Sequence, residues 1–391
     1  MLKTIIRESL KPCTDFSQLI DPISVDDFRE NYWEQKPFLI KGKAEFFSEL
    51  FQWQDVDNIF LDHTFRAKDI RVAKRGALVP EAKYIDSKGC IDPVAIAKLY
   101  QNDHTVVFEH LDKHHAKLRL FANEIESKLK LRSRTNVYVS PASSTGFNPH
   151  YDPHCVMIMQ IAGSKEWCLY ENSEVLPIDG HQKPLDSTIK PFATFMLEPG
   201  DVLYLPRGCI HAPRTIDKKS LHVTIGFKSY KYYEMLELLT QDIVQNSSYF
   251  RKGIAFDRSF DETEFKRQVI DFIKASDLAY YRDVIERKYL IKKQATVEQL
   301  FSHVEKVNSI NLSSVLTINK SVSYQMVSDE NKLKLTFDKC SLELPSVLKG
   351  AVEFIINTDL FSVSDIPYLN EEEQLALSKK LCQTNFIKIK D

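Results

Sequence analysis

Short apolar runs separated by turn residues fill the stretch from Thr135 to Phe227, and this pattern restricts the possible folds more than any other part of the chain. No helical spacing interrupts the pattern. Six short strands within about 90 residues are typical of an antiparallel β-sandwich or barrel. We predict these strands at Asn136–Ser140, Cys155–Ile161, Glu166–Tyr170, Thr194–Leu197, Val202–Leu205 and Leu221–Phe227. The centre of the chain is therefore expected to be an all-β unit.

The second predicted strand is preceded by a histidine and a carboxylate two residues apart. These are His150 and Asp152, in the stretch NPHYDPHCVMIMQIAGSKEW that runs from residue 148 to residue 167. Residues i and i+2 of a strand project from the same face, so we expect both side chains to point together into the barrel. The sequence thus predicts two metal ligands at this position.

A third ligand is expected from the stretch EPGDVLYLPRGCIHAPRT, from residue 198 to residue 215. The PGD and PRG tripeptides on either side of Val202–Leu205 are turn signals. A turn, a buried strand and a second turn then bring His211 to the earlier pair. Two histidines and one carboxylate form a facial triad that leaves open coordination positions on iron(II). A lone core histidine is common, but the joint pattern predicts a metal site at His150, Asp152 and His211.

Composition limits the class of protein. At 391 residues the chain exceeds the usual size of a single core, so we expect roughly two to four structural units. Its 43% hydrophobic and 27% charged residues are ordinary for a soluble globular protein, and its net charge of -2 does not support general nucleic-acid binding. No window approaches about 18 consecutive apolar residues, which argues against a membrane span.

The cysteines and the N-terminus bear on the compartment. The 7 cysteines are scattered and form no CxxC motif, which favours a reduced, intracellular environment. The opening MLKTIIRESLKPC has no long apolar core of the kind that a secretory signal needs. We therefore predict a cytoplasmic protein.

The residues before the β-rich unit show mixed signals. Residues 1–92 are predicted as an α/β extension, with a helix that begins at Ser24 and strands at Phe38–Ile40 and Ile70–Ala73. Helical spacing from Pro93 to Leu131 predicts helix leading into the barrel. We assign residues 93–229 to the barrel and its leading helix.

The residues after the β-rich unit predict two further units. Residues 230–293 show helical spacing throughout, which fits a packing cap or a dimerisation bundle. Residues 294–391 are expected to form a smaller winged-helix-like domain. It would contain a hairpin, a helix capped by Asn370 and an edge strand at Phe386–Lys390. The fold class is therefore α+β.

Several motifs together resemble a known family. They are Trp33-Glu34 with Lys36-Pro37, followed by NVYVSPASSTGFNPHYDPH, IAGSKEW, EPGDVLYLPRG and SLHVTIGF. In these motifs the chain resembles the JmjC-type cupin oxygenases, and it is most similar to the ribosomal-oxygenase branch. That resemblance implies a double-stranded β-helix (jelly roll) with flanking helices, a helical dimerisation region and a C-terminal winged helix. It also implies the cofactors Fe(II) and 2-oxoglutarate, with O2.

The resemblance implies roles for individual residues. His150, Asp152 and His211 would be the iron ligands, and Lys165 would pair with the distal carboxylate of 2-oxoglutarate, although a solvated turn lysine is an alternative. Tyr138, Asn136 and Thr224 would line the co-substrate pocket. His154 departs from the family pattern, and contact with substrate, an extra ligand position and plain packing all stay open for it. His222 is expected to be a core histidine or to support the ligands from behind.

The leading hypothesis is an Fe(II)- and 2-oxoglutarate-dependent hydroxylase that acts on an amino-acid side chain of a protein or peptide. A ribosomal protein and a natural-product precursor peptide are the candidate substrates. An N-methyl demethylase of the same cofactor class is one alternative, and a non-catalytic metal-binding interaction module is another. A homodimer through residues 230–293 is the expected assembly, with no membrane partner.

Overall fold

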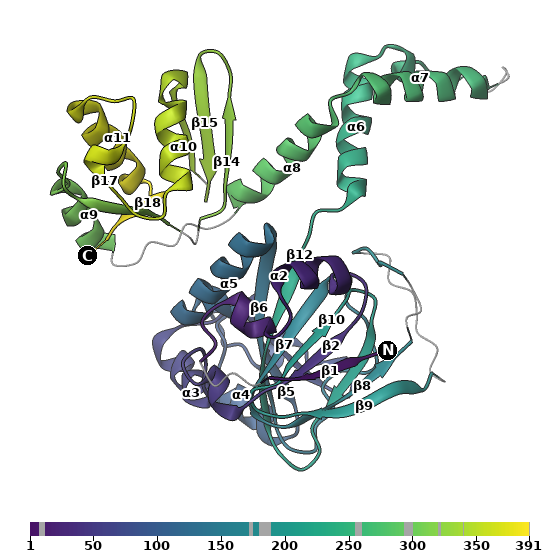
Figure 1. Ribbon diagram of the computed structural model, residues 1–391. Helices are drawn as coiled ribbons and strands as arrows, with labels where there is room; N and C mark the ends of the chain where they lie inside the picture. The colour runs from purple at the N-terminus through teal and green to yellow at the C-terminus, as the bar shows by residue number, and fades with distance from the viewer. Residues whose placement is uncertain are drawn as a thin grey trace. The chain divides into compact units, whose positions relative to one another are not determined.

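The computed structural model describes residues 1–7, 12–171, 175–179, 189–254, 260–292, 300–319, 322–338 and 340–390. Contacts divide the chain into two compact units, Met1–Lys228 and Ser229–Asp391 (Figure 1). None of the helices within these ranges is both long enough and apolar enough to cross a bilayer. The cysteines are free thiols.

The first unit is built on a sheet of nine strands, in the order β1-β2-β10-β7-β12-β6-β5-β3-β4. Neighbouring strands are antiparallel except for β1 and β2, which run parallel. The strands are β1 (Lys3–Ile6), β2 (Phe38–Lys41), β3 (Ile70–Lys74), β4 (Ala77–Leu78), β5 (Thr105–Phe108), β6 (Arg132–Ser140), β7 (Cys155–Gly163), β10 (Val202–Leu205) and β12 (Ser220–Lys228). The N-terminal segment thus supplies four strands of this sheet.

A second sheet of three strands completes the β-rich unit. Its order is β11-β8-β9, with β8 at Lys165–Tyr170, β9 at Pro191–Leu197 and β11 at Ile210–Arg214. The predicted antiparallel double-layer architecture is confirmed, and all six predicted strands are present. The additional strand β11 was not predicted, because IHAPR is short and contains a proline.

Alternation along the central strands separates two cores. Odd-numbered residues such as Val137, Met157 and Val223 pack with the N-terminal helices, whereas even-numbered residues such as Val156 and Ile158 pack with apolar residues of the small sheet. This is the period-2 pattern of a strand covered on both faces. Tyr138, His222 and Thr224 are also even-numbered, so their side chains project into the space between the two sheets.

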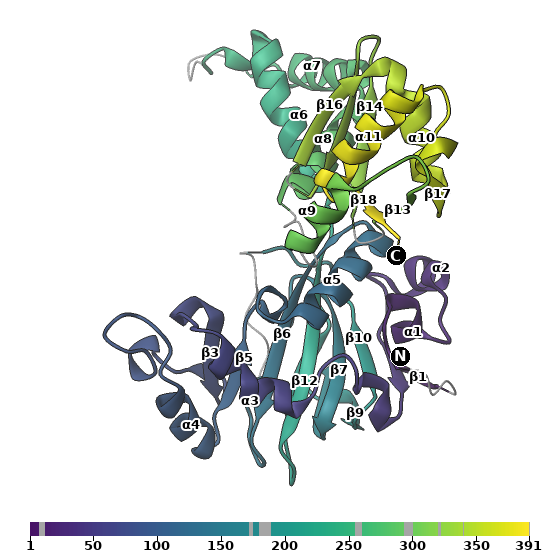
Figure 2. The ribbon, with the colours of Figure 1, turned by 90° about the vertical axis from the view of Figure 1, so that its left-hand side faces the viewer.

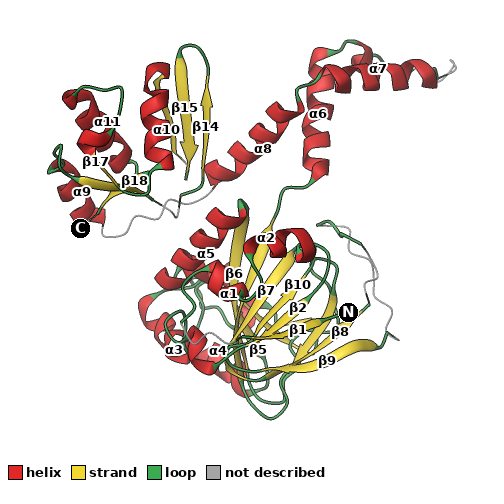
Figure 3. Cartoon of the chain, viewed as in Figure 1, coloured by secondary structure: helices red, strands yellow, loops and turns green. Residues whose placement is uncertain are grey.

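Helices cover the outer face of the large sheet (Figures 2 and 3). They include α1 (Phe16–Ile20), α2 (Val25–Asp27), α3 (Trp53–Asp62), α4 (Pro93–Gln101) and α5 (Ala116–Leu129). Ser24 caps α2, as predicted, by accepting a hydrogen bond from the amide of Asp27. Phe28, in the π-helical turn Phe28–Tyr32, has its ring 5.1 Å from that of Tyr204 on β10 and 5.5 Å from that of Phe16. These aromatic contacts join the N-terminal helices to the sheet.

The predicted helical stretch from Pro93 to Leu131 is wrong in its middle. Strand β5 lies between α4 and α5, and its sequence TVVF is buried at every position. A short run of β-branched residues in the interior of a sheet cannot be distinguished from a buried helical turn by periodicity alone. The β-propensity of the two valines was the signal that the spacing analysis overlooked.

The second unit combines helices with two small sheets. The helices are α6 (Tyr232–Asn246), α7 (Glu262–Ala275), α8 (Leu278–Lys292), α9 (Leu300–Asn308), α10 (Lys349–Asn357) and α11 (Glu371–Gln383). The sheets are β17-β13-β18 and β14-β15-β16, made from β13 (Val315–Ile318), β14 (Tyr324–Ser328), β15 (Lys332–Phe337), β16 (Cys340–Pro345), β17 (Phe361–Ser362) and β18 (Ile387–Ile389). The predicted hairpin is β15 and β16, and Asn370 caps α11 through a capping box.

Candidate metal and anion site

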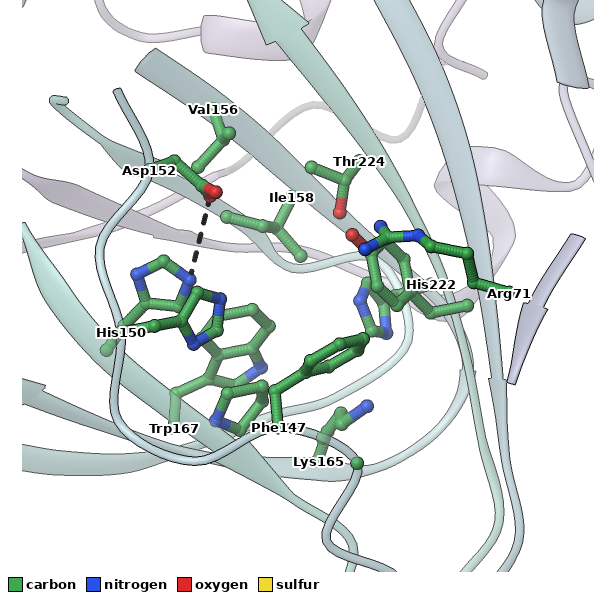
Figure 4. A pocket seen from close by; sticks show the side chains of 14 residues that line it. Arg71, Phe147, His150, Asp152, Val156, Ile158, Lys165, Trp167, His222 and Thr224 are labelled. Carbon is green, nitrogen blue, oxygen red and sulfur yellow. Dashed lines mark ion pairs between the residues drawn. The ribbon is translucent and has the colours of Figure 1, made fainter. Parts of the chain in front are cut away.

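Two histidines and one aspartate meet between the two sheets of the first unit. One ligand atom from each of His150, Asp152 and His211 lies within 4.8 Å of the others. The Nε2 atom of His211 is 3.9 Å from Oδ2 of Asp152, as the dashed line in Figure 4 marks. The three residues that the sequence singled out are therefore brought together, although 58 positions separate Asp152 from His211.

The local backbone that holds His150 and Asp152 differs from the prediction. Both residues precede β7, which begins at Cys155, so they are not on its face. Pro149 and Pro153 bracket them and have no amide hydrogen, which prevents a continuous ladder. His150 instead forms an isolated bridge to His211, with N···O distances of 3.1 and 2.8 Å. Backbone pairing therefore holds the two imidazoles side by side.

Backbone carbonyls orient both imidazoles. Nδ1 of His150 donates to the carbonyl of Asn148 at 2.8 Å, and Nδ1 of His211 donates to the carbonyl of Cys209 at 3.0 Å. A proton on Nδ1 leaves the lone pair of Nε2 free, which is the arrangement that a metal-binding histidine needs. The local hydrogen bonds therefore select the tautomer required for coordination.

The electrostatics of the three residues agree with this role. Burial, followed by the neighbouring His150, lowers the pKa of His211, so its imidazole is neutral at pH 7. Burial alone would raise the pKa of Asp152, but the charges of His211, His154 and His150 outweigh it, and the pKa lies below its usual value. The neutral imidazole of His211 and the ionised carboxylate of Asp152 are donors of the kind that suit iron(II).

A cavity of about 140 Å³ opens directly beside the three residues (Figure 4). Its walls come from both sheets and from the loop between β6 and β7. They are formed by Arg71, Tyr138, Gly146, Phe147, His150, Asp152, Val156, Ile158, Lys165, Trp167, His211, Pro213, His222 and Thr224. The cavity therefore contains the three candidate ligands together with Lys165, Tyr138 and Thr224.

Lys165 is an uncompensated cation in this cavity. Its side chain is only 3% exposed, and its Nζ donates to Oγ of Ser140 at 2.9 Å. Among the residues that the structure describes, none offers this ammonium a carboxylate partner. Burial lowers the pKa of Lys165 to about 7. Because a buried charge without a counter-ion costs free energy, the position is suited to a small anion.

A second cavity, of about 440 Å³, adjoins the first and shares Asp152, Tyr138 and Thr224 with it. Asn136 and His154 line this second cavity and not the first. The side-chain oxygen of Asn136 accepts a hydrogen bond from the amide of His110 at 3.1 Å. His154 packs against Gly226, where an added Cβ would lie 2.7 Å from its Nε2. Asn136 thus lines the second cavity and not the first, which contains Lys165.

Several cavity residues were not foreseen from the sequence, among them Arg71, Phe147 and Trp167. Arg71 reaches both cavities from β3 and forms an ion pair with Glu109. Phe147 places its ring 5.8 Å from that of His150, and Trp167 stacks on His211 at 5.7 Å and 29°. Trp167 lies two residues after Lys165, so strand parity could have identified it. Nothing in the local sequence marks Arg71, because it is contributed by the N-terminal segment.

Known proteins share the features of this unit. Residues 101–235 match the family model for the JmjC domain. Ribosomal oxygenase 2 of Rattus norvegicus is 31% identical over 222 residues, which make up 55% of this chain and 47% of that protein. The bifunctional lysine-specific demethylase and histidyl-hydroxylase NO66 of Drosophila persimilis is 28% identical over 250 residues, or 62% of this chain and 36% of that protein. The chain thus spans about half the length, or less, of these relatives.

Solved structures share the fold at low sequence identity. The Escherichia coli ribosomal oxygenase YcfD matches with a TM-score of 0.56 and 14% identity, covering 94% of this chain and 98% of that chain. The same protein in complex with cobalt and 2-oxoglutarate matches with a TM-score of 0.53 and 13% identity, again over 94% and 98% of the two chains. The first unit therefore has the cupin fold of JmjC domains.

Proposed function

Since the chain carries a JmjC domain, as its motifs predicted, we propose that it is an Fe(II)- and 2-oxoglutarate-dependent oxygenase that hydroxylates an amino-acid side chain of a protein or peptide. One observation carries the proposal. The triad of His150, Asp152 and His211 and the buried ammonium of Lys165 line a single cavity of about 140 Å³. A redox-active metal and a dicarboxylate co-substrate need these two kinds of group in one place.

Each residue has a defined task in this proposal. His150, Asp152 and His211 would hold iron(II), and Lys165 would hold the distal carboxylate of 2-oxoglutarate. When bound, iron and 2-oxoglutarate supply the oxidising chemistry, in which one atom of O2 enters the co-substrate, released as succinate and CO2, and the other enters the substrate. The apolar walls at Val156 and Ile158 exclude water from the bound groups, which limits competing reactions.

The second cavity supports a protein or peptide as the substrate. It adjoins the metal ligands at Asp152 and is about three times as large as the first, with volumes of about 440 and about 140 Å³. The relatives named ribosomal oxygenase 2 and histidyl-hydroxylase are consistent with a polypeptide substrate, and a ribosomal protein is the first candidate. A natural-product precursor peptide is the other.

Succinate release tests the proposal. Purified protein with iron(II), ascorbate and 2-oxoglutarate should release succinate, and the His211→Ala variant should not. Equal release from both proteins would disprove the metal assignment. No release from the wild type, with metal and 2-oxoglutarate nevertheless bound, would favour the non-catalytic interaction module.

Demethylation is a second candidate, because one relative is named as a lysine-specific demethylase. Mass spectrometry separates the two reactions. A peptide that gains one oxygen atom supports hydroxylation, whereas a peptide that loses one CH2 unit with release of formaldehyde supports demethylation.

The second unit is proposed to dimerise the protein. Helix α7 has no buried residue, and large apolar side chains are exposed on α6 and α7, with Tyr232 at 90%, Leu236 at 57% and Ile270 at 48%. Exposed apolar area of this kind is typical of an interaction surface. A Leu236→Glu/Ile270→Glu double variant should therefore elute as a monomer if the wild type is a dimer.

Two further proposals concern the C-terminal domain and the location of the protein. Helices α9–α11 with the β14–β16 meander support the winged-helix-like proposal. The free cysteines support a reducing, cytoplasmic location.

A further inference from the structure

His222 is a buried polar residue that the proposed chemistry does not yet use. It lies on β12, is 2% exposed and lines the first cavity. It is paired across the sheet with Tyr138, and the two rings stack at 4.6 Å and 7°. Within the described ranges its Nδ1 atom is buried and has no hydrogen-bond partner. A buried imidazole is normally hydrogen bonded, so its position calls for a ligand.

Two other donors converge on the same end of the cavity. Trp167 is 3% exposed, and its indole Nε1 is also buried without a partner among the described residues. Its ring lies 5.8 Å from that of His222. Lys165 precedes it on the same face of β8, and the Lys165 ammonium is close enough to help lower the pKa of His222. An ammonium, an indole N–H and an imidazole thus surround one small space, where oxygen acceptors are needed.

We propose that His222 donates a hydrogen bond to the distal carboxylate of 2-oxoglutarate alongside Lys165, and thereby helps the protein select a dicarboxylate co-substrate. This inference rests on the proposed function. The stacked Tyr138 ring holds the imidazole in one plane, which limits the entropy lost on binding. A carboxylate has two oxygens and about four lone-pair sites, so it can accept from the ammonium and the imidazole at the same time.

The imidazole acts here as a neutral donor. Burial, followed by the charge of Lys165, keeps the pKa of His222 well below its usual value. A neutral imidazole carries one N–H, which can point to the anion, whereas a second cation at this position would repel Lys165. The pair therefore combines one charge with one directional hydrogen bond.

The test compares two co-substrates that differ only in the distal carboxylate. Calorimetry measures the binding of 2-oxoglutarate and of 2-oxopentanoate to the Co(II)-loaded full-length protein. For the wild type, the Kd for 2-oxopentanoate divided by the Kd for 2-oxoglutarate reports how strongly the protein recognises the distal carboxylate. Replacing His222→Leu should reduce that ratio roughly tenfold, because a hydrogen bond to a charged group is lost. His222→Gln, which retains a donor, should recover part of it.

A structural role would give a different result. If His222 only packs against Tyr138, His222→Leu would weaken both ligands equally and leave the ratio unchanged, and this outcome overturns the inference. A ratio that does not recover in His222→Gln while the protein stays folded also counts against a hydrogen bond. His104→Gln is the matched control, because His104 is half-buried, bonds to the carbonyl of Leu99 and lies outside both cavities. A wild type that binds neither ligand would instead disprove the proposed function.

Discussion

The first cavity encloses about 140 Å³ and is lined by apolar and aromatic side chains together with polar ones, whereas the second encloses about 440 Å³ and is lined mainly by charged and polar side chains. In the first, Val156, Ile158 and Trp167 leave Lys165 as an uncompensated charge. In the second, Lys68, Arg71, Glu81, Glu109 and Arg134 balance one another to a large extent.

This contrast indicates different kinds of ligand. A small cavity in which the buried Lys165 ammonium has no carboxylate partner among the described residues favours a single small anion, because water does not screen the charge there. A larger cavity with mixed charges favours a polar side chain that arrives from solvent with part of its hydration retained. The two cavities meet at Asp152, so a group bound in each would face the metal from different sides.

Removing a ligand shared by both cavities should have the largest effect. Asp152→Ala deletes the only carboxylate of the triad, and we expect the affinity for Co(II) to fall by about 100-fold or more. Absorption titration with Co(II) measures this loss. Asp217→Ala is the control, because Asp217 is exposed on the same unit. Unchanged Co(II) binding by the Asp152 variant would place the metal elsewhere.

Removing the Lys165 charge from the first cavity should show that this cavity, and not the second, binds 2-oxoglutarate. Lys165→Met is expected to weaken 2-oxoglutarate binding by about tenfold or more, because a charge-assisted contact is lost. Without ligand, the same variant should melt at a temperature higher by about 2–4 °C or more, since the buried ammonium destabilises the folded state. Calorimetry and thermal unfolding test the two effects. The exposed Lys113→Met should change neither.

The pH dependence follows from the lowered pKa of Lys165, which is about 7. The ligand-free protein loses the ammonium as pH rises through 7, so the apparent Kd for 2-oxoglutarate should increase above that pH. The folded pKa lies below the unfolded one, so the unfolded state binds more protons between pH 7 and the normal lysine pKa of about 10.4. The destabilisation by Lys165 is thus full below pH 7 and declines as pH rises through this window. Lys165→Arg should remove the pH dependence of binding, because a guanidinium stays charged throughout this range. A wild-type Kd that stays constant from pH 6 to about pH 9 would contradict the role of the Lys165 charge in binding.

A substitution in the second cavity should spare 2-oxoglutarate binding and affect the substrate protein instead. His154→Ala is expected to leave the Kd for 2-oxoglutarate within about twofold of the wild type, while it reduces hydroxylation of the substrate protein about fivefold, the equivalent of one hydrogen bond. Quantitative mass spectrometry of oxygenated peptides measures the second effect. If the variant weakens 2-oxoglutarate and spares the substrate, the assignment of the two cavities is reversed.

Sequence reasoning succeeded where spacing determines geometry. The family resemblance pointed to Tyr138 and Thr224, which both line the first cavity, and turn signals predicted that His211 joins His150 and Asp152. It failed where distant segments meet, because pairing partners such as β3 are set by tertiary packing. Arg71 enters both cavities for that reason, and β5 escaped notice because burial on both faces removes alternation.

The N-terminal hairpin of β3 and β4 also braces the metal-binding loop, and this contact should produce the smallest effect. The amide of Gly76 donates to the carbonyl of Gly146 at 2.9 Å, and a Cβ on Gly76 would lie 2.3 Å from Nδ2 of Asn148. Asn148 supplies the carbonyl that orients His150. Gly76→Ala should therefore weaken Co(II) binding about twofold to fivefold.

Gly89→Ala is a matched control for the Gly76 variant. Gly76 and Gly89 have similar φ angles, +80° and +74°, but nothing lies within 4 Å of a Cβ on Gly89. Both variants should lose about 1 kcal/mol or more of stability from backbone strain, and only Gly76→Ala should lose metal affinity. Equal metal binding by the two variants would show that the hairpin does not position His150.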